Sequence, residues 1–199
     1  MEENNLITAT RLIVIGGSAG SLRTILDILP DLDTGLQAAI VVVLHRHHVY
    51  DSTLTELLSV RTSLAVKEAE EKEALMNGCI YIAPADYHLL VESDHTLSLD
   101  YSEKVNYSRP SIDVTLSSAA PVYGANMAAL LLSGGNTDGT EGLEEVREFG
   151  GLIAVQNPVV AEVEYMPKHA LQALDVQLVL SNEVMAGFIN RFASGELAG

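Results

Sequence analysis

The stretch RLIVIGGSAGSLRTILDIL, residues 11–29, decides the fold class. After Arg11 it has an apolar run at 12–15 and a turn of small residues at 16–20. The residues that follow are amphipathic with the period of a helix. A strand, a tight turn and a helix in that order form the first unit of an α/β fold. The helical spacing is carried by Leu22, Ile25, Leu26 and Leu29.

Five further apolar runs repeat the strand pattern, and most of them are apolar on both faces rather than alternating. Strands buried on both faces are typical of parallel sheets covered by helices. We therefore predict an α/β fold with a doubly wound, mostly parallel sheet flanked by helices. The five runs are 39–44, 80–83, 127–132, 152–155 and 177–180.

Amphipathic patterns lie between these runs. Thr53 and Glu56 have capping-box spacing just before Leu57 and Leu58, which predicts a helix over 53–60. Two longer helical stripes consist of Ile112, Leu116, Ala119, Ala120 and Tyr123, and of Met185, Phe188, Ile189 and Phe192.

One segment, YHLLVESDHTLSLDYSE at 87–103, departs from the alternation of strands and helices. It contains two short strand-like runs on either side of Ser93 and Asp94, a pattern typical of a hairpin. We expect a small antiparallel hairpin excursion from the α/β body.

Composition limits the function classes. The 199 residues suit one domain, and 11 Lys+Arg against 27 Asp+Glu give a net charge of −16, which disfavours nucleic acid and anionic lipid as partners. Cys79 is the single cysteine and is expected to be a buried thiol. The N-terminus lacks the pattern of a signal peptide, and the apolar runs are too short for membrane insertion, so a cytoplasmic location is expected.

Ser18 is the candidate nucleophile. Gly16-Gly17-Ser18-Ala19-Gly20 has the G-x-S-x-G pattern between a predicted strand and a predicted helix, the context in which that pattern holds a reactive serine. The N–H groups at the start of the helix would face a developing oxyanion. A phosphate-binding or purely structural glycine turn is the alternative, although the dinucleotide spacing G-x-G-x-x-G is missing.

His45 is the leading candidate for the base that a serine hydroxyl needs. It follows the most apolar predicted strand, at the same sheet edge as the Ser18 turn. His47 and His48 are interpreted as surface loop residues. The group His45-Arg46-His47-His48, followed by Asp51, also suggests a metal site as an alternative. No H-E-x-x-H or paired-cysteine ligand set accompanies it, so neither a metal nor a cofactor is predicted. His88, His95 and His169 are interpreted as structural.

Asp138 is the candidate acid. The segment MAALLLSGGNTDGTEGLEEV repeats the order of strand, glycine-rich turn and helix, and places Asp138 in the turn. A carboxylate there could orient the imidazole of His45 and stabilise its charged form. Asp138-Gly139 is also an ordinary turn pair.

Six segments taken together resemble, in order and over nearly the whole chain, the catalytic domain of the chemotaxis protein-glutamate methylesterases of the CheB type. They are LIVIGGSAGS, VVVLHRHH, GCIYIAPADYHLLV, VNYSRPSIDVTLSSAA, LLLSGGNTDGTEGL and GLIAVQNPVVAEVEYMPKHAL.

The resemblance implies a Ser-His-Asp triad made of Ser18, His45 and Asp138, with oxyanion donors at Ala19 and Gly135. It implies hydrolysis of γ-glutamyl methyl esters on the cytoplasmic helices of methylated chemoreceptors, with release of methanol, and deamidation of receptor glutamines.

Four positions depart from the family pattern. Ala19 replaces the common Thr, Gly135 the common Met, Leu44 the usual Gln, and Ser21 a usual Gly. These departures keep open a catalytically weakened module that binds receptors. A different small-molecule serine hydrolase is a further alternative. Arg109 is a candidate for positioning an acidic receptor segment, or else a solvent-facing salt-bridging residue.

The predicted organisation is an N-terminal extension at 1–10, a methylesterase catalytic domain at 11–193 and a tail at 194–199. The resemblance also implies that family members usually carry an N-terminal receiver domain. With ten residues before Arg11, we expect either a free-standing esterase domain or a piece of a larger fusion, such as one with the matching methyltransferase. A separate or fused methyltransferase or regulator is therefore an expected partner.

Overall fold

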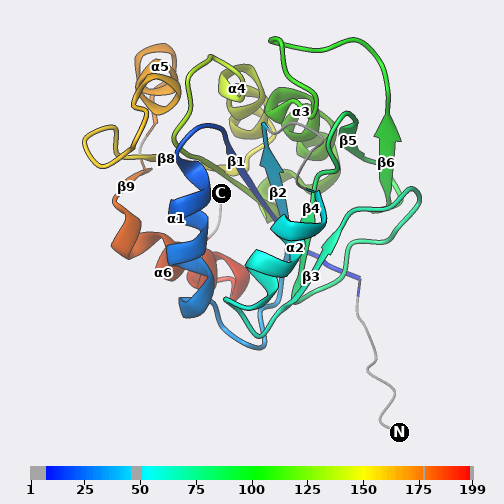
Figure 1. The fold of residues 1–199 in the computed structure, drawn as a ribbon. Helices are drawn as coiled ribbons and strands as arrows, with labels where there is room; N and C mark the ends of the chain where they lie inside the picture. Colours follow the sequence, from blue (N-terminus) through cyan, green and yellow to red (C-terminus); the bar gives the residue numbers. More distant parts are fainter. Residues whose placement is uncertain (1–7, 46–50, 177, 198–199) are drawn as a thin grey trace, which may run out of the picture.

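A seven-stranded parallel sheet forms the centre of the computed structural model, which describes residues 8–45, 51–176 and 178–197. The strand order is β3-β4-β2-β1-β7-β8-β9, and every neighbouring pair is parallel (Figure 1). The strands are β1 (Leu12–Gly17), β2 (Ala39–Leu44), β3 (Ala65–Glu68), β4 (Cys79–Ile82), β7 (Met127–Leu131), β8 (Leu152–Gln156) and β9 (Leu178–Leu180).

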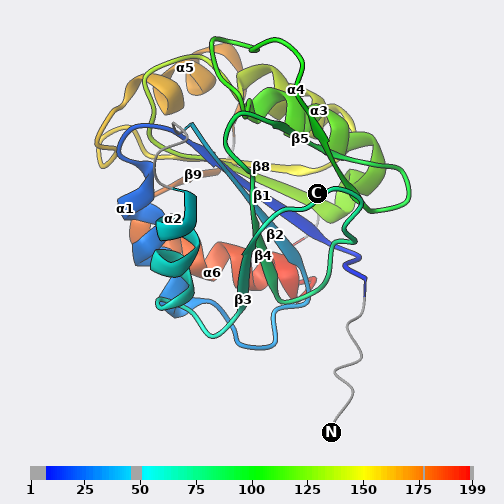
Figure 2. The same cartoon turned by 45° about the vertical axis from the view of Figure 1, so that its right-hand side comes forward.

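Helices cover both faces of this sheet, as Figure 2 shows most clearly. One face carries α1 (Ser21–Ile28), α2 (Asp51–Ser59) and α6 (Asn182–Ala193), and the other carries α3 (Ile112–Tyr123), α4 (Thr140–Glu148) and α5 (Tyr165–Ala173). Two short 3₁₀ helices, η1 (Leu29–Asp31) and η3 (Gly124–Asn126), follow α1 and α3.

The two layers explain why the strands are apolar on both faces. In β1, Leu12 and Val14 belong to the core cluster under α3 and α4, whereas Ile13 and Ile15 belong to the cluster under α1 and α6. Successive side chains of a strand point to opposite faces, so a strand between two helical layers has no polar side. The predicted doubly wound fold is confirmed.

The chain changes direction at β1. From β1 it moves outward through β2 to β4 and β3, and it later returns to add β7, β8 and β9 on the other side. The turn after β1 leads to α1 on one face, and the turn after β7 leads to α4 on the other. Such a switch point opens a crevice at the carboxyl edge of the sheet, where ligands bind in open α/β folds.

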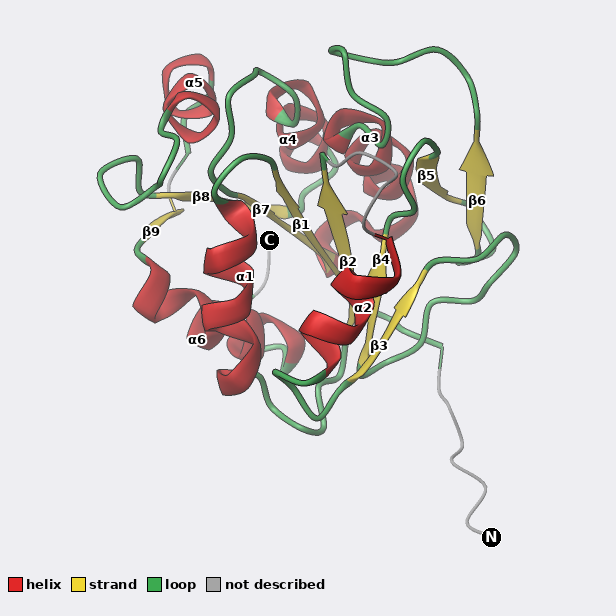
Figure 3. Cartoon of the chain, viewed as in Figure 1, coloured by secondary structure: helices red, strands yellow, loops and turns green. Residues whose placement is uncertain are grey.

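The predicted hairpin is confirmed as β5 (His88–Val91) and β6 (Leu97–Asp100). It forms a two-stranded sheet of its own and lies beside α3 (Figure 3). The Oγ1 of Thr115 on α3 donates to the carbonyl of Leu89 at 2.8 Å, and the N–H of Val91 donates to the Oγ of Ser118 at 3.0 Å. The chain then returns to α3 through residues 101–111.

Two expectations about the elements need adjustment. Strand β3 was not predicted, because AVKE at 65–68 is partly exposed and has no apolar run. The helix predicted over 53–60 begins at Asp51 instead, so Thr53 lies inside α2 rather than capping it. Cys79 is buried in β4 as expected. No helix in the described residues combines the length and apolar character needed to cross a membrane.

Helix α6 provides a test of the packing. Ile189 is fully buried under the sheet, whereas Val184 on the same helix is half exposed. We expect Ile189→Ala to lower the free energy of unfolding by about 2–5 kcal/mol, because a cavity remains where the side chain packed. Val184→Ala should change it by less than about 0.5 kcal/mol. Urea denaturation of both variants checks this; equal losses would contradict the assigned helix orientation.

Candidate active site

Ser18, His45 and Asp138 lie on three turns at the carboxyl edge of the sheet, after β1, β2 and β7. Main-chain hydrogen bonds join these turns. The N–H of His45 donates to the carbonyl of Gly17 at 3.2 Å, and the N–H of Ser18 donates to the carbonyl of Ser133 at 2.8 Å. The turn of the serine is therefore fixed between the turns of the histidine and the aspartate.

Small residues around Ser18 are required by close packing. A Cβ atom on Gly17 would lie 2.5 Å from the Cβ of Ser21, and one on Gly134 would lie 3.1 Å from the Cβ of Ser18. Gly20 has a φ of 82°, a conformation that glycine adopts without strain. These contacts let the β1 and β7 turns approach each other, which accounts for the glycines seen in both sequence motifs.

His45 and Asp138 form a close pair. The Nε2 of His45 lies 2.6 Å from the Oδ2 of Asp138, and the two side chains are 12% and 0% exposed. Asp138 also lies at the N-terminus of α3. Its carboxylate accepts hydrogen bonds from the Ser111 hydroxyl at 2.7 Å and from the N–H groups of Ile112 at 2.7 Å and Asp113 at 3.2 Å.

The environment of Asp138 favours its ionised form. Burial by itself would raise the pKa of the carboxyl group, but the hydrogen bonds from His45, Ile112 and Ser111 outweigh it and lower the pKa to about 2. The unpaired N–H groups at the start of a helix stabilise negative charge in the same way. Asp138 is thus a carboxylate at neutral pH.

An ionised carboxylate only accepts hydrogen bonds, so the Nε2 of His45 carries the proton of the neutral ring. The Nδ1 atom then has a free lone pair and can act as a base. Ser108 Oγ lies 3.3 Å from Nδ1. No pattern in the sequence marks Ser108, which lies on the return from the hairpin to α3.

The Ser18 hydroxyl makes no hydrogen bond to the His45 ring within the described residues. Both side chains line the same two cavities, of about 330 and 230 Å³. The histidine and the aspartate are therefore in contact, whereas the serine shares cavities with the histidine without bonding to it. An unprotonated Nδ1 that shares a cavity with a serine hydroxyl is suited to acyl transfer.

The turns also offer backbone donors. Ala19 and Gly135 are exposed, and neither N–H group donates a hydrogen bond to any residue that the structure describes. The preceding N–H groups differ, since those of Ser18 and Gly134 donate to Ser133 and Val163. Two free N–H groups on facing turns beside a serine are typical of an oxyanion-binding site.

Asp113 is a second buried acid that sequence reasoning missed. Its Oδ1 accepts from the N–H groups of Gly139 at 2.9 Å and Gly142 at 2.7 Å, at the start of α4, and its Oδ2 accepts from the Asn106 side chain at 2.8 Å. Burial chiefly raises the pKa of Asp113 to about 7, and the charge of Asp138 adds to the shift. An acidic residue two positions after the capping Ser111 was the available signal.

Arg109 lines the smaller cavity with Ser18 and His45. Its Nη1 donates to the carbonyls of Tyr101 at 3.1 Å and Ser102 at 2.6 Å, and its guanidinium stacks on the Tyr101 ring at 3.9 Å. Arg109 thus braces the loop from β6 to α3. Lys104, Tyr107 and Ser108 from this loop, together with Asp86, complete the cavity wall.

The other described histidines do not reach this site. His88 is buried, and its Nε2 donates to the Glu103 carbonyl at 2.9 Å while its Nδ1 accepts from the Ser111 N–H at 3.2 Å. His95 packs edge-on against Tyr123, and the Nδ1 of His169 lies 3.0 Å from the Thr140 hydroxyl.

The described part of the chain contains no group of three or more His, Cys, Asp or Glu side chains that could hold a metal ion. Arg46, His47 and His48, which gave rise to the question of a metal, lie outside the described residues.

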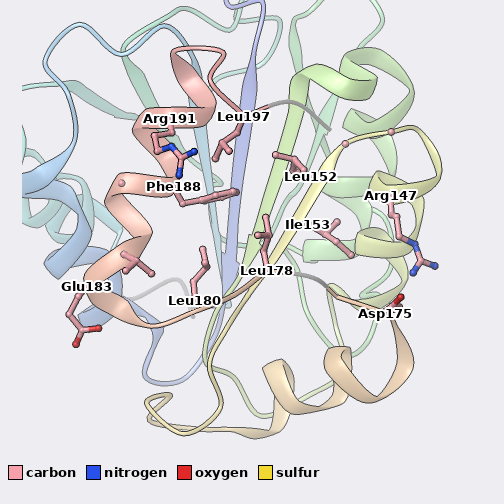
Figure 4. A pocket seen from close by; sticks show the side chains of 14 residues that line it. Arg147, Leu152, Ile153, Asp175, Leu178, Leu180, Glu183, Phe188, Arg191 and Leu197 are labelled. Atoms are coloured by element: carbon pink, nitrogen blue, oxygen red, sulfur yellow. The ribbon is translucent and has the colours of Figure 1, made fainter.

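A larger cavity of about 790 Å³ lies away from these turns, along β8, β9 and α6 (Figure 4). Its floor is apolar, with Leu152, Leu178 and Phe188, and charged side chains such as Arg147 and Glu183 lie around it. Because it contains neither a nucleophile nor a base from the three turns, the candidate active site is the smaller pair of cavities.

Fold and site together define a doubly wound α/β protein with a serine, a histidine–aspartate pair and free N–H groups at one sheet edge. The family model for CheB methylesterase matches residues 13–189, so the chain belongs to the CheB methylesterase family. The predicted family and the predicted enzyme class are confirmed at this level.

Curated relatives agree with this assignment. A putative protein-glutamate methylesterase/protein-glutamine glutaminase of Leptospira interrogans is 42% identical over 185 residues, which cover 93% of this chain and 96% of that protein. The corresponding enzyme of Thermotoga maritima is 36% identical over 165 residues, 81% of this chain but 48% of that protein. The chain thus spans about half of the Thermotoga protein.

Among solved structures, the CheB methylesterase catalytic domain of Thermotoga maritima matches with a TM-score of 0.88 and 32% identity. The match covers 93% of this chain and 99% of that domain. The half of the Thermotoga protein that this chain resembles is therefore its catalytic part.

The buried acid pair predicts a pH dependence of stability. The pKa of Asp113 is raised from 3.8 to about 7, so between these values the folded protein holds a proton that the unfolded chain has lost. Stability must then fall as pH rises from about 4 to about 7. We expect Asp113→Asn to flatten this slope, as measured by urea denaturation across the range. An unchanged slope in the variant would contradict the assignment.

Asp138 affects stability in a separate pH range, since its lowered pKa removes stability only as pH falls from 3.8 towards about 2.

Proposed function

We propose that this protein hydrolyses γ-glutamyl methyl esters on the cytoplasmic helices of methylated chemoreceptors, releasing methanol and restoring the carboxylates. The observation that carries the proposal is the pair of His45 and Asp138, whose geometry leaves Nδ1 unprotonated, within hydrogen-bond distance of Ser108 and beside the cavities that Ser18 lines. The names of the relatives, which combine methylesterase and glutaminase, support the choice of substrate.

The reaction begins at Ser18. Its Oγ attacks the ester carbonyl after rotating towards the Nδ1 of His45, which accepts the hydroxyl proton. The imidazolium formed in this step keeps its Nε2–H on the Asp138 carboxylate, 2.6 Å away, so the new positive charge lies against a buried negative one. The N–H groups of Ala19 and Gly135 donate to the oxyanion.

Collapse of the tetrahedral intermediate releases the alcohol. The Nδ1–H of His45 returns the proton to the departing methoxide, so methanol leaves and a glutamyl-Ser18 ester remains. Water activated by the same Nδ1 then cleaves that ester and regenerates the serine and the free carboxylate. With a glutamine side chain the same steps release ammonia, which accounts for deamidation at the same site.

The charge of the second cavity supports an acidic polypeptide substrate. The chain has only 11 basic residues, yet Lys104 and Arg109 both line the cavity beside Ser18 and His45, against one acidic residue, Asp86, among the lining residues. A receptor segment that carries several glutamates would find local positive charge on a protein whose net charge is −16. We extend the proposal to residues 11–193 as the catalytic domain and to a methyltransferase or regulator, separate or fused, as a further partner.

Two serines lie near His45, and substituting each tests the mechanism. We expect Ser18→Ala to reduce methanol release from methylated receptor by at least about 10³, because the nucleophile is lost. Ser108→Ala should cost no more than about fivefold, because its hydroxyl makes only long, neutral hydrogen bonds of 3.3–3.4 Å, with His45, Asn106 and Asn136, and the His45–Asp138 pair stays in place.

Circular dichroism of both variants controls for folding. Inactivation by Ser108→Ala with a fully active Ser18→Ala would overturn the role of Ser18. Labelling of Ser18 by a serine-reactive phosphonate, followed by peptide mapping, gives an independent readout of the same nucleophile.

A charge substitution tests the substrate class. We expect Lys104→Ala to raise KM for acidic methylated receptor peptides by about two- to fivefold with little change in kcat, because an exposed charge contributes up to about 1 kcal/mol. The difference should shrink at high salt.

Arg147→Ala is the matched control for Lys104→Ala. Arg147 is an exposed basic residue in the last turn of α4, whereas the site lies at the first turn of that helix. Equal effects of the two substitutions would show that overall charge, rather than the cavity, attracts the substrate.

A further inference from the structure

The larger of the two cavities beside Ser18 is apolar. It has a volume of about 330 Å³ and lies against the faces of α1 and α2 that meet the end of β2. Four leucines line it together with Ser18, His45, Ser21 and Thr53. The leucines are Leu22, Leu44, Leu54 and Leu57.

Core packing does not account for all four leucines. On α2, Leu58 is fully buried and fills the core under the sheet, while Leu57 keeps 41% of its surface exposed. Leu54 and Leu57 are three positions apart and therefore lie on one side of the helix. Leu54 is buried in the core under the sheet, whereas Leu57 does not belong to that core, so among the described residues it is Leu57 whose apolar surface is left open in the cavity that Ser18 lines.

The cavity is larger than the reaction needs. A methyl ester presents one carbon beyond the ester oxygen, whereas 330 Å³ lies within the range of pockets that hold small ligands. Apolar walls around such a volume favour an apolar group, since each buried CH₂ contributes about 0.8 kcal/mol. Because Ser18 and His45 line the cavity, a group that enters it lies beside the reacting ester and can belong to the same substrate.

We infer that this cavity binds an apolar side chain of the substrate, of about the size of leucine, one helical turn away from the glutamyl ester. The inference rests on the proposed function, in which the ester lies on a helix. On a helix, residues three or four positions apart lie on one face with Cβ atoms about 5–6 Å apart. A glutamyl ester at Ser18 therefore carries such a neighbour into the leucine-lined cavity.

Synthetic helical peptides test the inference. Each carries one glutamate γ-methyl ester, with leucine or alanine at one of four positions: three or four residues before the ester, or three or four after it. We expect leucine to raise kcat/KM for methanol release about tenfold over alanine at one or more of these positions. The gain should fall below about threefold in Leu57→Ser, which makes the wall of the cavity polar.

Val60→Ser is the matched control, because Val60 follows α2, is 78% exposed and does not line the cavity. It should retain the full preference for leucine. Leu44→Gln changes the cavity at its β2 end and should act like Leu57→Ser. A preference that survives both Leu57→Ser and Leu44→Gln would overturn the inference.

Binding separates this inference from the proposed function. Ser18→Ala protein, which cannot form the acyl-enzyme, should bind the fluorescently labelled leucine peptides more tightly than the alanine peptides in an anisotropy titration. Tighter binding without methanol release by the wild type would reject the proposed function and keep the cavity assignment. Methanol release with no preference for leucine over alanine at any position would keep the proposed function and reject the cavity assignment. Neither binding nor release would overturn both.

Discussion

The carboxylate of Asp138 is the interaction on which the site depends. It is fully buried, and it is stabilised where the N-terminus of α3 supplies the N–H groups of Ile112 and Asp113 and the hydroxyl of Ser111. A buried charge without such partners would cost several kcal/mol. Because His45 is also a partner, the same carboxylate joins the turn after β7, the start of α3 and the turn after β2.

A second buried carboxyl group, that of Asp113, lies close to Asp138, so two negative charges would repel each other there. Asp113 extends from the first turn of α3 to the first turn of α4, where the Gly139 and Gly142 N–H groups donate to it. Two neighbouring buried acids repel each other when both are ionised, and this repulsion adds to burial in raising the pKa of Asp113, whereas hydrogen bonds from His45, Ile112 and Ser111 lower the pKa of Asp138. The three hydrogen bonds and His45 assign the negative charge to Asp138, and Asp113 takes up the proton at low pH.

Much of this arrangement was predictable from the sequence. Apolar runs on both strand faces indicated a covered parallel sheet, and residues that follow parallel strands reach one edge, which brought Ser18, His45 and Asp138 together in the hypothesis. Strand β3 was not predicted because it lies at the sheet edge and is partly exposed, so its sequence has no apolar run. Ser108 was missed because its role arises from the return of the chain at 101–111 across the site, a tertiary contact without a local pattern. Asp113 had a local signal in the first turn after Ser111, but its contacts with Asn106 and the start of α4 are tertiary.

The double winding also accounts for the unequal sides of the site. The apolar cavity is formed by α1, α2 and the end of β2, so its leucines continue the core of one face of the sheet up to the catalytic edge. The polar cavity is formed by the return from the hairpin, which leads to α3 on the opposite face and carries Lys104 and Arg109. Ser18 and His45 lie where the two cavities meet, because both line each of them. A substrate helix with an apolar side and an acidic side would therefore lie across the switch point in one orientation, and the fold itself would select which glutamyl group reaches the serine.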